Sequence, residues 1–491
     1  MSDQVITAPA RPKLTWQTRQ LINGKLVEGQ GASLSVENPA TEEILATFNQ
    51  ASVEQVDEAA QAARAAFESG VWSDGELRKR CLLKFADIME ARMEELGSAL
   101  VQEVGTPVKL VKPLQVGGAL DLLRHHAPQA PVDRTRKLGP TAEGGGESIV
   151  RYIPVGVVAA ITAYNYPLLL MAAKLGPALA AGCTVVLLPS PQTPLSTLLL
   201  ADMIREAGFP DGVVNIVVGG VDVGRALSEH PQVDKVTFTG SVGVGAAVMQ
   251  QAAKSIKGVV LELGGKSAAI VLPDADHKRA ATPLNQRYLR NAGQGCSTTT
   301  RILVHESKMD EFIKLSQEVL AAGKVGDPSD PQTDAGPLIS KAHRARVEAY
   351  VERALAAGGR IVAGGGRPDL AKGAYMNPTL IAGVDNSHEI ARDELFAPVA
   401  VLLPYRDIDE AVAIANDSHF GLAAAVWGPP EQAMKVAERI RAGSVHVNGG
   451  GAGRRQDVPF GGMKQSGIGR EWGEEGLYEF LEAQHINYAY A

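Results

Sequence analysis

Residues 154–260 alternate between short, mostly apolar runs and longer stretches that suit helices. The apolar runs predict strands at 155–161, 184–188, 213–218 and 235–239. The stretches between and after them predict helices at 168–181, 193–208 and from 246 to 256. Continuous apolar strands that alternate with helices are typical of a parallel sheet covered on both faces. Ligands of such sheets bind at the carboxyl ends of the strands.

The same alternation repeats between residues 261 and 445. The pattern predicts strands at 268–272, 301–304, 400–403 and 444–447, and helices at 310–322 and 340–357. Strands and helices in this order again favour a parallel sheet. We therefore predict a second sheet domain of the same Rossmann-like type.

The first 127 residues combine a hairpin signal with helices. Asn23-Gly24 at the centre of 20–27 is a typical two-residue hairpin turn. Ser52 and Gln55 form a capping-box pattern at the start of a helix over 52–70. Two further helices are predicted over 75–104 and 114–126. The adjacent His125 and His126 point to different helix faces, so we interpret them as structural and predict no metal site.

Two segments break the regular pattern. Residues 128–148 are rich in Pro, Arg, Gly and Glu, and β spacing resumes at 149–153, which is compatible with either a flexible linker or a projecting hairpin. The tail from Asn448 is rich in glycine. Its last residues, 485–491, are compatible with an edge strand that pairs with a neighbouring subunit.

Composition narrows the function classes. The chain has 491 residues, 45% of them hydrophobic and 21% charged, which is too long for one compact domain and indicates two or three. The formal net charge of -7 argues against a general nucleic-acid footprint. No apolar run approaches the roughly 18 residues of a membrane span. The N-terminal residues contain no apolar segment typical of a secretion signal.

The three cysteines are Cys81, Cys183 and Cys296. An odd, scattered set does not form a disulfide framework and suits a reducing cytoplasm. Cys296 lies in a window of small residues that includes Gly293 and Gly295, and glycine allows a backbone to pass close to a ligand. We hypothesise that the Cys296 thiol attacks a carbonyl carbon. The alternative is that it is a small core hydrophobe, as most lone cysteines are.

Two further segments are candidates for chemistry. The apolar run 258–261 ends in Glu262, which is followed by Leu263-Gly264-Gly265-Lys266. We hypothesise that Glu262 activates water, the alternative being a solvated strand-end glutamate. The segment 240–245 has the order G-x-x-G-x-G, which differs from the usual dinucleotide fingerprint. On its own it is equally compatible with a tight strand-to-helix turn.

Together, these motifs resemble those of the aldehyde dehydrogenase superfamily, in the family's order, over residues 20–487. The matching segments are Ala163-Tyr164-Asn165-Tyr166-Pro167, 176–186, Phe238-Thr239-Gly240-Ser241, Glu262-Leu263-Gly264-Gly265-Lys266, Gly293-Gln294-Gly295-Cys296, 394–399 and Pro459-Phe460-Gly461-Gly462. The resemblance implies an α/β aldehyde dehydrogenase-like fold with three parts. These are a cofactor-binding domain (1–128 and 152–261), a catalytic domain (262–448), and an oligomerisation flap with the C-terminal tail (129–151 and 449–491). A homodimer or homotetramer is implied as well.

The resemblance also implies a mechanism. Cys296 forms a thiohemiacetal with the aldehyde, hydride leaves for a nicotinamide ring, and a thioester remains. Glu262 corresponds to the general base that hydrolyses the thioester, which places the chain in the hydrolytic branch. The Asn165 side chain and the Cys296 backbone N–H correspond to the oxyanion donors, although Asn165 also suits a turn. Lys174 corresponds to a lysine near the site, the alternative being a solvated helix lysine.

The cofactor implied is NAD or NADP. Glu394 and Phe396 correspond to the residues that hold the nicotinamide ribose and ring, and Ser241 to the pyrophosphate end. Further implied contacts are Ile161, Thr162, Ala163, Tyr164, Ser190, Gly220, Phe238, Thr239, Gly240, Leu263 and Gly264. Leu188 and Pro191 stand where the family usually has a lysine and a glutamate for the adenosine ribose. We therefore predict loose binding of the adenosine end of the cofactor and weak discrimination between NAD and NADP, with NAD slightly favoured.

The implied substrate is a small-molecule aldehyde. The residues expected to line its tunnel are Tyr166, Leu170, Ala173, Gln294, Ser297 and Phe460. A bulky aromatic is common where Ala173 stands, so a wide tunnel for bulky apolar or aromatic aldehydes is predicted. No obvious basic residue is available to hold a substrate carboxylate.

Two rival interpretations stay open. The first is a reductase of acyl-CoA or acyl phosphate that uses the same cysteine, against which Glu262 argues. The second is a non-catalytic binding or structural protein with this fold. The departure at Leu188 is compatible with the second rival, and the presence of Cys296, Glu262 and Asn165 argues against it.

Overall fold

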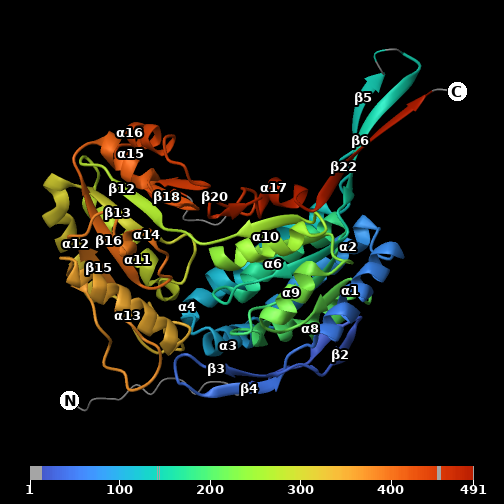
Figure 1. The fold of residues 1–491 in the computed structure, drawn as a ribbon, viewed down its shortest axis with the longest axis horizontal. Coiled ribbons are helices and arrows are strands. Elements are labelled where there is room, and N and C mark those ends of the chain that lie inside the picture. The colour runs from blue at the N-terminus through green and yellow to red at the C-terminus, as the bar shows by residue number, and fades with distance from the viewer. Residues whose placement is uncertain (1–13, 141, 143, 451–454, 490–491) are drawn as a thin grey trace.

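Two sheets carry the fold, and a narrow three-stranded ribbon projects beyond them (Figure 1). The computed structural model describes residues 14–140, 142, 144–450 and 455–489. Both large sheets are built around parallel strands. The predicted α/β class, with two parallel sheets and a small β flap, is therefore confirmed. No helix in the described ranges is both long enough and apolar enough to cross a bilayer.

The first sheet has eight strands in the order β2-β1-β9-β8-β7-β10-β11-β21. Its parallel centre consists of β9 (Val214–Ile216), β8 (Thr184–Leu188), β7 (Val157–Ile161), β10 (Lys235–Thr239) and β11 (Gly258–Glu262). Antiparallel strands complete both edges: β1 (Gln20–Ile22) and β2 (Lys25–Val27) on one side, and β21 (Gly467–Ile468) on the other. A short segment of the C-terminal tail thus completes a sheet built by the first half of the chain.

Helices cover both faces of this sheet because successive strand residues point to opposite sides. Val158 and Ala160 of β7 share one apolar core with α2 (Gly75–Ala91), α3 (Met93–Glu103), α5 (Val116–His126), α6 (Pro167–Ala181) and α8 (Leu200–Ala207). Val157 and Ala159 share another with α1 (Val53–Glu68), α9 (Val221–Glu229) and α10 (Val242–Ala253). The continuous apolar runs in the sequence reflect this two-sided burial.

The local signals at the N-terminal end are confirmed. Asn23 and Gly24 both have positive φ, as the hairpin turn between β1 and β2 requires. The Gln55 N–H donates to Ser52 Oγ, and the Ser52 N–H donates to Gln55 Oε1, which completes the capping box of α1. The predicted helix over 75–104 is instead divided at Arg92, whose backbone leaves helical geometry. A π-helical turn that contains Pro113 precedes α5, because proline cannot donate the regular helical bond.

The second sheet has seven strands in the order β14-β15-β16-β13-β12-β18-β19. Its strands are β14 (Arg360–Gly364), β15 (Thr379–Ala382), β16 (Val399–Tyr405), β13 (Thr299–His305), β12 (Ser267–Val271), β18 (Ala423–Trp427) and β19 (Ser444–Val447). One face packs on α11 (His277–Leu289) and α12 (Met309–Ala322). The other packs on α13 (Lys341–Ala356), α15 (Ile408–Asn416) and α16 (Pro430–Ala437).

The ribbon resolves the ambiguous segment before residue 149 as a hairpin. It consists of β5 (Arg136–Pro140), β6 (Gly146–Pro154) and β22 (Leu481–Ala489), and it extends away from both sheets in Figure 1. β22 pairs with β6 along its whole length. Residues 485–489 therefore pair within their own chain along one edge of β22, which is the outer strand of the ribbon, and their pairing with a neighbouring subunit stays a prediction.

Candidate active site

Most of the predicted cofactor residues lie at the carboxyl edge of the first sheet. They lie at the end of, or directly after, β7 (Ile161, Thr162, Ala163, Tyr164), β8 (Leu188, Ser190, Pro191), β10 (Phe238, Thr239, Gly240, Ser241) and β11 (Leu263, Gly264), while Gly220 begins α9. The segment after β11 crosses to the second sheet, where Ser267 of β12 lies opposite Thr299 of β13. Cys296 directly precedes β13. The candidate site therefore lies where the two sheets meet.

Two glycines after β11 permit unusually close packing at this junction. A Cβ atom added at Gly265 would lie 2.4 Å from the Cys296 carbonyl oxygen, and one at Gly264 would lie 2.3 Å from Glu394 Oε2. A side chain at Gly265 would therefore displace the Cys296 backbone, and one at Gly264 would displace the Glu394 carboxylate. The Gly265 N–H also donates to Glu394 Oε1 at 3.0 Å. The glycine pair thus packs the candidate nucleophile and the candidate ribose-binding carboxylate against one segment.

Cys296 is half-buried and lies in a negative environment. Burial, with the Glu394 and Glu262 carboxylates next in importance, raises the pKa of its thiol to about 12. A hydrogen bond from the Ser297 backbone N–H acts in the opposite direction. The resting thiol is therefore protonated near neutral pH, and its activation requires a base or added positive charge nearby.

Glu262 ends β11 and is only 3% exposed, so it is not a solvated strand-end residue. Both of its carboxylate oxygens are buried and have no hydrogen-bond partner among the described residues. Burial, followed by the neighbouring Glu471 carboxylate, raises the pKa of Glu262 well above its ordinary value, and Lys174 opposes this. A buried carboxylate without partners and with a raised pKa is poised to accept a proton.

Lys174 is also buried, which excludes the alternative of a solvated helix lysine. Its Nζ forms an ion pair of 2.6 Å with Glu471 and a hydrogen bond of 3.0 Å to Thr237 Oγ1. Sequence reasoning did not single out Glu471. Its only signal was a charged Arg470-Glu471 pair inside a glycine-rich tail.

The two predicted oxyanion donors are linked through the loop before Cys296. One Asn165 Nδ2–H donates to the Gln294 carbonyl at 3.0 Å, which leaves the second N–H of the amide for a ligand. The Cys296 backbone N–H has no acceptor within the described part of the chain. Asn291 and Ala292 both have positive φ, a strained conformation that clusters at functional sites.

Residues at the carboxyl edge of the first sheet suit the pyrophosphate of a dinucleotide better than they suit its adenosine ribose. Ser241 begins α10 with its side chain exposed and unused for capping, and Thr239 Oγ1 is buried without a partner in the described ranges. A free helix N-terminus of this kind suits a pyrophosphate. Tyr164 meets Phe396 edge to face at 5.8 Å. Leu188, by contrast, is buried in the apolar core and offers no polar contact.

The six predicted substrate residues divide into two groups. Tyr166, Leu170, Ser297 and Phe460 keep partial solvent contact, and Phe460 stacks on Trp472 at 4.9 Å. Ala173 and Gln294 are sealed from solvent. The Gln294 amide bonds to Asn291, Pro337, Ile339 and Tyr164. In this structure Gln294 therefore braces the loop before Cys296 and does not form part of an open wall.

The structure corrects the expectation that no basic residue is available near the substrate. Arg287 of α11 donates from Nη2 to the carbonyl and to the Oγ of Ser297, both at 3.4 Å. Ser297 directly follows Cys296. Sequence reasoning missed Arg287, although it and Arg290 precede the cysteine by only a few residues.

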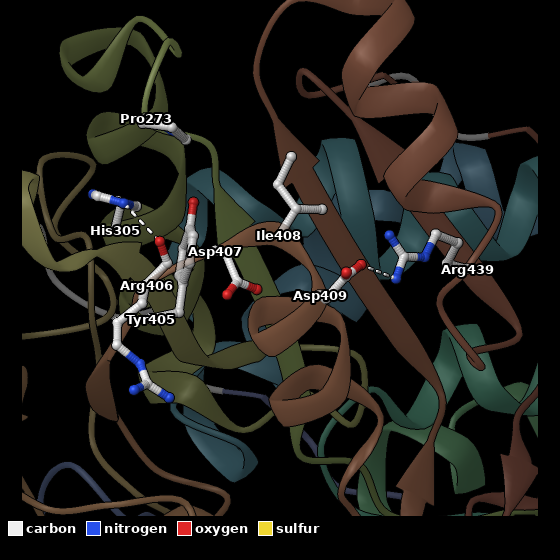
Figure 2. Close-up of a pocket in the computed structure, with 8 residues that line it drawn as sticks. All are labelled: Pro273, His305, Tyr405, Arg406, Asp407, Ile408, Asp409 and Arg439. Carbon is white, nitrogen blue, oxygen red and sulfur yellow. Dashed lines mark hydrogen bonds and ion pairs between the residues drawn. The ribbon is translucent and has the colours of Figure 1, made fainter.

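A wide surface hollow of about 470 Å³ lies elsewhere, at the carboxyl edge of the second sheet. Figure 2 shows His305 and Tyr405 on one side of it and the Asp409–Arg439 pair on the other. His305 bonds to the Arg406 carbonyl, and Tyr405 donates to the Val271 carbonyl. The polar groups in this hollow are largely paired with one another, and none of the predicted site residues lies there.

Comparisons with known proteins cover nearly the whole chain. The model of the aldehyde dehydrogenase family matches residues 26–486. The chain is 41% identical over 483 residues to a mitochondrial aldehyde dehydrogenase of Leishmania tarentolae, which covers 97% of this chain and 96% of that one. It is 41% identical over 471 residues to 3-succinoylsemialdehyde-pyridine dehydrogenase of a Pseudomonas species, covering 95% and 97%.

Solved structures are similar over nearly the whole chain. A cysteine-to-alanine mutant of aldehyde dehydrogenase C from Pseudomonas syringae, in complex with NAD+ and octanal, has a TM-score of 0.91 at 41% identity and 96% coverage of both chains. Betaine aldehyde dehydrogenase of Staphylococcus aureus in complex with NAD+ has a TM-score of 0.92 at 36% identity, covering 96% of this chain and 95% of that one.

Proposed function

The chain belongs to the aldehyde dehydrogenase family, and we propose that it oxidises an aldehyde to the free carboxylic acid, with Cys296 as nucleophile and Glu262 as general base. The observation that carries the proposal is the buried Glu262 carboxylate, which has no hydrogen-bond partner among the described residues. It lies close enough to Cys296 for its charge to raise the pKa of the thiol. A base in that position explains release of a free acid. Acyl transfer to a second substrate would not require it.

In the first step the Cys296 thiol loses its proton, which Glu262 accepts and passes to solvent, and the sulfur bonds to the aldehyde carbon and leaves a negative oxygen. The free N–H of the Asn165 amide and the Cys296 backbone N–H are the donors proposed for that oxygen. A bound nicotinamide dinucleotide supplies the acceptor for the hydride that leaves the same carbon. A thioester at Cys296 results.

Hydrolysis of the thioester requires a proton acceptor for water. Glu262 takes that proton, and the carbon–sulfur bond breaks to release the acid and the thiol. Lys174 acts as a positioning residue, since its ion pair with Glu471 offsets one of the two charges that raise the pKa of Glu262. Without this positive charge, Glu262 would hold its proton to higher pH.

We propose NAD as the preferred cofactor, with weak discrimination against NADP. Glu394, anchored by the Gly265 N–H, and Phe396 are the contacts proposed for the nicotinamide riboside, and Ser241 with the start of α10 for the pyrophosphate. Leu188 gives no hydrogen bond to an adenosine ribose, and Pro191 carries no charge to repel a 2′-phosphate. The preference for NAD is supported by similar proteins whose structures are in complex with NAD+.

For the substrate, we propose an aldehyde with a bulky apolar or aromatic body. The accessible side chains of Tyr166, Leu170 and Phe460 support this. We also propose a homodimer or homotetramer, since α10 exposes Val244 and Met249 and is followed by the exposed Ile256. A reducing cytoplasm is proposed because the mechanism requires a free thiol.

Two variants test the mechanism. Cys296→Ala is expected to abolish aldehyde-dependent reduction of NAD, and Glu262→Gln to accumulate an acyl-enzyme that intact-protein mass spectrometry detects. Oxidation at the wild-type rate by Cys296→Ala would disprove the mechanism. An acyl-CoA product formed in preference to the acid when coenzyme A is added would favour the reductase alternative.

A further inference from the structure

Charges around Cys296 are distributed unevenly. Glu394 and Glu262 are near enough to the thiol to raise its pKa, and Glu394 belongs to the side on which the dinucleotide is proposed to bind. Arg287 and Arg290 lie on the side of Tyr166 and Ser297. Burial raises the pKa of the Tyr166 hydroxyl to about 12, and the positive charges of Arg290 and Arg287 act against that rise. The substrate side of the thiol is therefore cationic.

Neither arginine has a carboxylate partner among the described residues. Arg287 is half-buried, and within the described chain its side chain bonds to Ser297 alone. Its unused nitrogens keep solvent access, since none of them is sealed and unpartnered. Arg290 caps the C-terminal end of α11 and is exposed. Burial, together with the nearby Arg290 charge, lowers the pKa of Arg287.

A half-buried guanidinium without a counter-charge is costly, and here a second guanidinium lies beside it. A guanidinium presents planar, paired donors that match a carboxylate in two-bond geometry. Burial, followed by the Arg287 charge, lowers the pKa of His446 of β19, so this imidazole is a neutral neighbour of Arg287. The charges of Arg290, Cys296 and Arg287 all act on the Tyr166 hydroxyl, so Tyr166 lies near all three, and its side chain keeps partial solvent contact.

We propose that the substrate is an aldehyde with an apolar body and a carboxylate at its far end, held by Arg287 and Arg290. The inference rests on the proposed function, because it assigns the class of aldehyde that Cys296 oxidises. The product is then a dicarboxylate: the aldehyde carbon gains the oxygen of water and loses its hydride to the nicotinamide. Ser297 orients Arg287 through the two bonds of 3.4 Å.

The test compares 4-formylbenzoate with methyl 4-formylbenzoate, which share the aromatic aldehyde and differ in charge. The wild-type kcat/KM is expected to favour the carboxylate by about 10- to 100-fold, as one charge-assisted contact predicts. Arg287→Gln is expected to reduce that ratio by about 10-fold through KM, and Arg287→Lys to restore part of it. Arg290→Gln, an exposed change that does not threaten folding, is expected to reduce the ratio by about 3-fold.

Arg279→Gln is the matched control, because Arg279 is exposed on the same helix with no side-chain partner in the described chain. It is expected to leave the ratio unchanged. Equal kcat/KM for the acid and the ester in wild type would overturn the proposal, as would Arg287→Gln lowering both equally, since Arg287 would then only hold the Ser297 loop. If neither aldehyde were oxidised, together with no turnover of neutral aliphatic aldehydes, the proposed function itself would fail.

Discussion

The two sheets of this protein have similar architecture but very different carboxyl edges. At the edge of the first sheet, Glu262, Thr239 and Asn165 have buried polar atoms without partners among the described residues. At the edge of the second, the hollow of Figure 2 has Asp409 paired with Arg439, and His305 and Tyr405 bonded to backbone carbonyls. The hollow at the second edge is therefore open to solvent, but its polar groups already have hydrogen-bond or ion-pair partners.

The difference has a physical cause. A buried polar atom without a partner costs free energy, so a fold retains it only where something else is gained. Polar groups that pair with one another have little left to offer a ligand. The edge proposed as the site therefore differs from the hollow in its unsatisfied and perturbed groups, which is why the proposal rests on them and not on volume.

The largest effect is expected from removing one partner of the buried Lys174–Glu471 ion pair, which lies close to Glu262 at the edge of the first sheet. Lys174→Met leaves Glu471 buried without its ion-pair partner, so the free energy of unfolding is expected to fall by about 3–5 kcal/mol. It also removes the charge that lowers the pKa of Glu262, so the acid limb of kcat against pH should move to higher pH. Urea denaturation and pH–rate profiles measure the two effects.

The exposed Lys254–Glu229 pair supplies the control, because Lys254→Met is expected to cost no more than about 1 kcal/mol. An unchanged acid limb in Lys174→Met would show that Glu262 does not respond to this ion pair.

A second test sharpens the contrast by adding charge at the adenosine end. Pro191→Glu introduces a carboxylate where a 2′-phosphate would approach, and we expect the kcat/KM ratio of NADP to NAD to fall about tenfold by like-charge repulsion. Pro191→Gln has the same size without the charge and should change the ratio little. A wild-type preference for NADP above about a hundredfold would contradict the predicted weak discrimination.

The pH dependence of the thiol provides a third test. Because the pKa of Cys296 is raised to about 12, its alkylation by iodoacetamide in the cofactor-free protein should accelerate continuously between about pH 7 and pH 10. Glu394→Gln removes a charge that raises this pKa and should speed alkylation several-fold at about pH 8. Peptide mass spectrometry separates Cys296 from the buried Cys81 and Cys183. A plateau near pH 8 would indicate a thiol with a much lower pKa.

The smallest effect is expected at the second edge. Asp409→Asn breaks an exposed ion pair with Arg439, so the free energy of unfolding should change by less than about 1 kcal/mol. Aldehyde oxidation should not change, because the hollow is remote from Cys296. A large loss of kcat in this variant would show that the second edge contributes to function after all.

Local patterns in the sequence predicted much of the fold. The apolar runs located β7, β8 and β10, and Ser52 with Gln55 located the start of α1. Such signals succeed because their partners lie within a few residues or follow from the two-sided burial of a parallel sheet. Cys296 and Glu262 were singled out as candidates in the same way, from the small residues around one and the strand before the other, and the family resemblance then favoured their catalytic roles.

Partners that are distant in the chain could not be predicted. Lys174 pairs with Glu471 across 297 positions, and no local pattern relates them. The same limit explains why Gln294 was expected on an open wall, and why Arg287 was missed beside Ser297. The sequence by itself determined most of the secondary elements and which side chains are candidates for the chemistry, because these depend on local hydrophobicity and chemistry. Only the tertiary structure decided which charges are buried together and which stay unpaired, because burial and pairing depend on the path of the whole chain.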